Sequence, residues 1–231
     1  MELAIFQLDG LMFLLRWGHF LFGVAWIGLL WYFNFVQGPF FAETEAGVKT
    51  AATQKLVPRA LWWFRWGAMF TFLTGLLLMS LKIHQAGGMG LFSTSWGAMI
   101  VPGVLMGLTM WYNVWFVIWP AQQKVIAAAN GETVDNVPAI ARRAFLASRT
   151  NTLFSIPMLF FMGAASHLPI QVQNPMATWF ILVTVLIGAI EANALTANKG
   201  PTTEPIETIK SVITSGLVLA GVLYFIAEAL L

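Results

Sequence analysis

The chain has 231 residues, of which 58% are hydrophobic and only 10% are charged, whereas soluble domains average about 45–50% apolar and about 25% charged residues. So few charges cannot cover the outside of a soluble globule. The composition therefore excludes a disordered chain and a nucleic-acid-binding protein. The absence of cysteine excludes disulfides, iron–sulfur clusters, thiolate zinc sites and covalently attached haem. We expect an integral membrane protein that lies in a lipid bilayer.

A membrane-spanning helix needs about 20 mostly apolar residues, and six stretches meet this requirement. They cover residues 11–36, 61–83, 96–119, 152–168, 176–197 and 209–231. The first stretch is too long for the core of a cleavable signal peptide, and acidic rather than basic residues precede it. We therefore predict an all-α bundle of about six transmembrane helices that forms a single domain over residues 1–231.

Lysine and arginine predict how the bundle is oriented, because they concentrate in cytoplasmic loops. Ten of the twelve lie in or beside the loops after the first, third and fifth spans, and only Arg16 and Lys82 lie on the other side. Both termini are therefore expected outside, in a bacterial inner membrane. The longest cytoplasmic loop, residues 120–147, is expected to extend the third span as a helix over 122–130 and to start another helix at Pro138. For Arg142, Arg143 and Arg149 two roles are open, contact with anionic lipid headgroups and an anion-binding site.

The three histidines all fall in the outer half of the predicted bundle. His19 lies about eight residues into the first span, or roughly 12 Å below the outer edge, and His167 lies near the outer end of the fourth. His84 ends the second span. An ionisable side chain inside a bilayer is costly and commonly marks a functional site. The alternative to a functional role is that each histidine is a neutral imidazole, which either forms a hydrogen bond with a neighbouring helix or faces water.

Two imidazoles from different helices at similar depth suit the two faces of a non-covalent b-type haem. We predict His19 and His167 as ligands of a haem iron, with His84 as a further candidate; copper or zinc also accept neutral imidazole. Arg16 and Lys82 are the cations available for the haem propionates, although simple snorkelling of both side chains is an equal alternative. No catalytic residue is assigned.

Other polar side chains lie within the spans towards the cytoplasmic side. They are Asn34, Asn113, Glu191 and Asn193. Hydrogen bonds between helices are the favoured role for the asparagines. For Glu191 a place on a proton or substrate path is equally open, because a carboxyl group in the membrane needs a partner or water.

Several short motifs follow one another between residue 11 and residue 170. They are residues 16–19 (Arg-Trp-Gly-His), 23–28, 113–114, 118–124, 131–132, 141–149, 148–152, 157–160 and 166–169. In this consistent order they resemble the membrane-bound urate hydroxylase family, also catalogued as the urate oxidase N-terminal domain. The chain departs from the family where Thr150 replaces a histidine and where the third span has none.

The resemblance implies a membrane oxidoreductase that passes electrons from its substrate to a cytochrome c, with water supplying the oxygen. Many family members carry that cytochrome as a C-terminal domain. This chain has no cysteine to attach one, so the cytochrome is expected to be a separate polypeptide. Two other classes remain open: a cytochrome b subunit that exchanges electrons with quinone, and a non-enzymatic transporter or assembly subunit. A homo- or hetero-oligomer is a further expectation.

Overall fold

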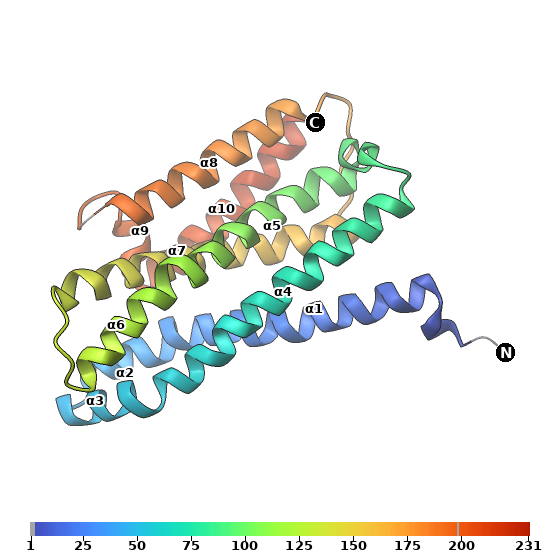
Figure 1. Ribbon diagram of the computed structural model, residues 1–231. Coiled ribbons are helices and arrows are strands. Elements are labelled where there is room, and N and C mark those ends of the chain that lie inside the picture. Colours follow the sequence, from blue (N-terminus) through green and yellow to red (C-terminus); the bar gives the residue numbers. More distant parts are fainter. Residues whose placement is uncertain (1–2, 198) are drawn as a thin grey trace.

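The computed structural model describes residues 3–197 and 199–231, and within these residues every regular element is a helix (Figure 1). The long helices are α1 (Leu8–Trp31), α4 (Val57–Gln85), α5 (Ser95–Tyr112), α7 (Val137–His167), α8 (Ala177–Thr196) and α10 (Ile209–Leu230). The shorter ones are η1 (Ala4–Phe6), η2 (Tyr32–Gln37), α2 (Gly38–Glu43), α3 (Ala46–Lys55), η3 (Met89–Ser93), η4 (Asn113–Ile118), α6 (Trp119–Ala129) and α9 (Glu204–Glu207).

Five helical segments are long and apolar enough to cross a membrane. They are Leu8–Glu43, Val57–Gln85, Ser95–Ala129, Ala177–Thr196 and Ile209–Leu230. The predicted all-α membrane architecture is thus confirmed, and each of these segments contains or largely overlaps one predicted span. The remaining predicted span, 152–168, lies within α7, a helix that is not among the five. A total of six spans therefore stays a prediction.

Helix α7 lies in the middle of the bundle, where it packs against α5, α6, α8 and α10 (Figure 1). Its residues 149–155 are all buried, although five of the seven are polar. The neighbouring helices supply the apolar surface that faces outward, with many exposed side chains of leucine, phenylalanine and valine. A polar helix inside an apolar shell is the arrangement expected where lipid replaces water as the solvent.

The predicted cytoplasmic loop at 120–147 is mostly helical. Helix α6 continues the third span to Ala129, and α7 begins at Val137 with Pro138 in its first turn, so both helices predicted in this segment are confirmed. The link between them turns at Gly131 (φ 92°) and at Asn136 (φ 52°). These are the positive φ values that glycine and asparagine adopt most readily. The connection between the first two spans also contains a helix, α3, which was not predicted.

Glycines allow two close helix contacts. A Cβ atom at Gly67 of α4 would lie 3.1 Å from the backbone nitrogen of Trp26 in α1. A Cβ at Gly216 of α10 would lie 3.1 Å from the carbonyl oxygen of Leu153 in α7. Pro157 has no N–H to offer that carbonyl, yet α7 continues through Pro157 to His167. Small residues at such contacts are typical of membrane helices.

The start of α1 and the C-terminus lie at the same end of the bundle as the α4–α5 and α7–α8 connections (Figure 1). Near the C-terminus, the carbonyl oxygen of Leu231 accepts a backbone hydrogen bond of 2.9 Å from Asn174 in the α7–α8 connection. Helices α2, α3, α6 and α9 gather at the opposite end (Figure 1). The assignment of this opposite end to the cytoplasm rests on the lysine and arginine distribution.

Single cysteines test this orientation, because the chain itself has none and gives no background labelling. We introduce Met89→Cys in the α4–α5 connection or Glu132→Cys in the α6–α7 link, both at exposed positions. In intact spheroplasts a membrane-impermeant maleimide should label the first variant and spare the second. Inverted vesicles should give the reverse. Labelling of Glu132→Cys in spheroplasts would show that the orientation is the reverse of the predicted one, with the histidines on the cytoplasmic side.

Candidate functional site

His19 lies on α1 against a threonine of α4. The ring atom Nδ1 of His19 is 3.1 Å from the Oγ1 atom of Thr74, whose hydroxyl donates to the carbonyl of Phe70 over 2.6 Å. Because that hydroxyl hydrogen is used, Thr74 accepts from the Nδ1–H of His19. The other ring nitrogen, Nε2, then carries the lone pair that can bind a metal. A glycine at position 75 makes room for the ring, since a Cβ there would lie 3.2 Å from Cε1 of His19.

The hydrogen bonds between α1 and α7 give the relative heights of His19 and His167. Trp31 Nε1 donates to the Oγ of Ser155 over 2.9 Å, and the two helices run in opposite directions. Trp31 is 12 residues after His19, and Ser155 is 12 residues before His167. With a rise of 1.5 Å per residue, both histidines lie about 18 Å from this contact in the same direction. They therefore share one level of the bundle, as the sequence predicts.

The other predicted outer residues differ in their surroundings. His167 and His84 are exposed at the ends of α7 and α4, and Arg16 is exposed on α1. Lys82 is partly buried, with its Nζ 5.8 Å from the ring centre of Trp96. Within the described residues no group of three or more histidine, aspartate or glutamate side chains could hold a metal ion. A haem held by two histidines needs no such group, and the ligands His19 and His167 stay a prediction.

Two π-helical segments interrupt the spans towards the other end of the bundle. Segment η2 ends at Gln37 and η4 ends at Ile118, each two residues before a proline, Pro39 or Pro120. Proline cannot donate to the preceding turn and clashes with it, and the wider π turn absorbs this conflict. Each π segment carries a buried asparagine, Asn34 or Asn113. These segments were not predicted, although a proline inside a helical pattern was the available signal.

One face of α7 bonds to both π segments. Asn34 donates to the Oγ of Ser148 over 2.8 Å, and Asn113 donates to the Oδ1 of Asn151 over 2.9 Å. Asn151 in turn donates to the carbonyl of Met110 over 3.0 Å. The predicted role of the asparagines as links between helices is thus confirmed for Asn34 and Asn113. Asn193 instead bonds the carbonyl of Thr202, close to the end of its own helix.

Glu191 of α8 joins this network through Asn113, which donates to its Oε2 atom over 2.9 Å. The Oε1 atom of Glu191 and the Oδ1 atom of Asn113 are both buried and accept no hydrogen bond from the described residues. Both atoms are acceptors, so a proton on the carboxyl group or a water molecule would satisfy them. The geometry makes Glu191 an intramembrane acid with one fixed partner.

The three arginines of the α7 region have different environments. Arg142 donates two hydrogen bonds to the carboxylate of Glu207 in α9, one of them 3.0 Å long. Arg143 is exposed. Arg149 is only 7% exposed, and its Nε and Nη1 atoms have no hydrogen-bond acceptor among the described residues. The sequence grouped these three residues, but the structure separates them. Arg142 forms an ion pair, Arg143 faces outward, and Arg149 is a buried cation whose Nε and Nη1 atoms have no partner among the described residues.

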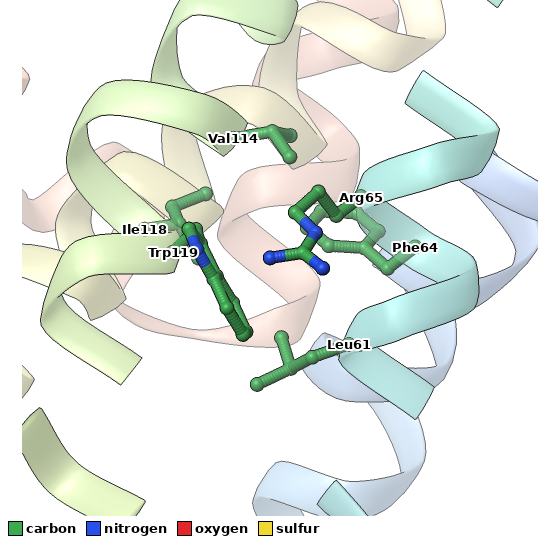
Figure 2. Close-up of a pocket in the computed structure, with 6 residues that line it drawn as sticks. All are labelled: Leu61, Phe64, Arg65, Val114, Ile118 and Trp119. Carbon is green, nitrogen blue, oxygen red and sulfur yellow. The ribbon is translucent and has the colours of Figure 1, made fainter. Parts of the chain in front are cut away.

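A fourth arginine, Arg65, is partly buried. Figure 2 shows the Arg65 guanidinium of α4 beside the indole ring of Trp119, at 3.9 Å from the ring centre. Trp115 lies 5.4 Å away. Cation–π contacts of this kind compensate a charge that has lost water. The remaining lining of this narrow pocket is apolar and consists of Leu61, Phe64, Val114 and Ile118 (Figure 2).

Comparison with known proteins identifies the family. The urate oxidase N-terminal family matches residues 83–224, which is more than half of the chain. The chain belongs to the urate oxidase N-terminal family. No curated protein and no solved structure matches it. The family match contains η4, α7 and α8 with Asn113, Asn151 and Glu191, and it also contains His167. His19 lies outside the matched region.

Asn113 of η4 bonds to both α7 and α8. Its loss should therefore destabilise this member of the urate oxidase N-terminal family. In Asn113→Leu the carboxylate of Glu191 and the Oδ1 of Asn151 each lose their donor. A buried unsatisfied group costs about 1–3 kcal/mol, so the free energy of unfolding should fall by about 3 kcal/mol. Denaturant titration in detergent measures this change, with the exposed Gln123→Leu as control. Equal stability of both variants would contradict the assigned network.

The ion pair between Arg142 and Glu207 predicts a pH effect. The Arg142 guanidinium lowers the pKa of the Glu207 carboxyl from 4.5 to about 2. The pKa of Glu207 is lower in the folded protein than in the unfolded chain. The ion pair therefore stabilises the folded protein fully above the pKa of the unfolded chain, and this stabilisation is lost as the pH falls towards 2. Glu207→Gln should cost about 1 kcal/mol at neutral pH. Melting temperatures of both proteins should converge between pH 4.5 and pH 2, and a constant difference would contradict the pair.

Proposed function

We propose that this protein is a urate-hydroxylase-related oxidoreductase of the bacterial inner membrane that uses one b-type haem held between α1 and α7. His19 and His167 are the residues that would bind the haem iron, and a separate cytochrome c is the proposed electron acceptor. The common level of these two histidines, about 18 Å from the Trp31–Ser155 contact, is the observation on which the proposal rests.

The surroundings of His19 fit a haem ligand. Thr74 holds the Nδ1–H and leaves the lone pair of Nε2 available. Second partners of this kind fix the tautomer and the orientation of metal-binding histidines. Gly75 lets the ring pack directly against α4, since a Cβ there would lie 3.2 Å from Cε1 of His19. His167 is exposed at the end of α7, so its ring can turn towards a group between the helices. A bound haem would supply one-electron redox chemistry at this level.

The cations near this level have a separate role. Arg16 is one turn from His19 on α1, and Lys82 is near the outer end of α4. Both are suited to bind the propionate groups, which are the charged edge of a haem. In the proposed reaction urate gains one oxygen atom from water and releases two protons and two electrons. The electrons leave in two single steps to the cytochrome c.

A transporter is the second candidate, because the structure contains buried polar groups that a haem protein does not require. Glu191, Asn113 and the unpaired Arg149 lie inside the bundle. Intramembrane acids and cations often mark the path of a proton or a substrate. Haem content separates this candidate from the oxidoreductase.

Purified protein should contain about one haem per chain in a pyridine haemochrome assay. His19→Ala and His167→Ala should each lose the low-spin haem spectrum, because each removes one proposed ligand of the iron. His84→Ala is the matched control and should keep most of it. Full haem retention in both ligand variants would refute the ligand pair. Complete absence of haem from the native protein, expressed with adequate haem supply, would favour the transporter.

Anaerobic addition of urate to oxidised protein tests the substrate. We expect the haem bands to become reduced within seconds, and reoxidation to follow on addition of cytochrome c. Reduction by a quinol analogue but not by urate would instead assign the protein as a quinone-linked cytochrome b subunit. Xanthine, which lacks one of the three carbonyl oxygens of urate, serves as the control compound.

A further inference from the structure

Arg149 is the most unusual charge in the bundle. Its side chain is only 7% exposed, and the N–H groups at Nε and Nη1 meet no acceptor among the described residues. A guanidinium is always charged in proteins, so this group cannot become neutral to reduce the cost of burial. Buried cations are normally paired with an acid or with a bound anion.

The acid that acts on Arg149 does not neutralise it. Glu207 is close enough to act on it electrostatically, but both of its carboxylate oxygens accept hydrogen bonds from Arg142. Lys199 adds a further positive charge that acts on Glu207. Three cations thus act on the one carboxylate of Glu207.

Aromatic rings do not replace the missing acid either. Arg65 is covered by the indole of Trp119 at 3.9 Å, whereas Arg149 contacts the ring of Phe145 at 5.1 Å. That same ring also faces Arg142, at 5.3 Å. Phenylalanine is a weaker partner than tryptophan for a cation, and here two cations share it.

We propose that Arg149 is the anchor of an anion-binding site at the α9 end of α7, and that it takes an anion with two acceptor atoms in one plane. Each of the two unpaired N–H groups, at Nε and at Nη1, shares an edge of the guanidinium with an N–H of Nη2. Such parallel donors match a carboxylate, a phosphate or the lactam edge of an acidic purine. The identification of this anion as urate rests on the proposed function, but the site itself does not.

The site is separate from the level of the two histidines. Arg149 and His167 are 18 residues apart on one continuous helix, which corresponds to about 27 Å. In the predicted topology Arg149 lies on the cytoplasmic side. The site therefore binds its anion from the cytoplasm, away from the proposed haem, and its role is recognition of the anion.

Equilibrium dialysis of urate against the whole protein in phosphatidylcholine nanodiscs, in a buffer free of phosphate, tests the site. We expect saturable binding that inorganic phosphate displaces. Arg149→Gln should weaken it at least tenfold. Arg143→Gln, which removes the same charge from an exposed position of the same helix, should change it less than twofold. His19→Ala should also leave it unchanged, so failure of the proposed haem and failure of this site are distinguishable.

Two further arms complete the experiment. Arg149→Lys keeps the charge but loses the planar pair of donors, and it should bind more weakly than the native protein even if Arg149→Gln does not fold. Nanodiscs with phosphatidylglycerol test the lipid source: loss of urate binding there, restored by excess urate, would show that a lipid headgroup reaches the same site. Absence of any urate or phosphate binding, or equal loss in Arg143→Gln and Arg149→Gln, would overturn the proposal.

Discussion

In a lipid bilayer a buried amide or hydroxyl group has no water to bond, and α7 brings a run of such groups into the middle of this bundle. The other helices are arranged around that requirement. Ser148, Asn151 and Ser155 each bond a side chain from a different segment, Asn34, Asn113 and Trp31. Each unsatisfied group would cost about 1–3 kcal/mol, so these bonds fix the rotation and height of α7 against α1 and α5.

The π segments explain how two apolar spans can present an asparagine to α7. A regular helix with a proline four or more residues from its start would lose a hydrogen bond and meet a steric clash. The wider turns of η2 and η4 avoid that conflict just ahead of Pro39 and Pro120. They also occur at equivalent places in the two hairpins, α1 with α4 and α5 with α7. Such wide turns are frequently found at functional sites.

Charge divides the bundle into two parts. Towards one end lie the histidines, with few ionised groups around them, and towards the other lie Glu191, Arg149 and the ion pair of Arg142 with Glu207. The distance of about 27 Å between Arg149 and His167 along α7 separates binding of a charged molecule from the proposed redox chemistry.

The sequence by itself determined the membrane class, the helical fold, most span positions and the family. All of these follow from composition, apolar length and local motifs, which do not depend on distant contacts. It also predicted that Asn34 and Asn113 bond between helices. Only the tertiary structure separated Arg142, Arg143 and Arg149, because their roles depend on Glu207 of α9 and on burial by other helices. The π segments and the Asn113–Glu191 contact likewise required the packed bundle, since each depends on how helices distant in sequence meet.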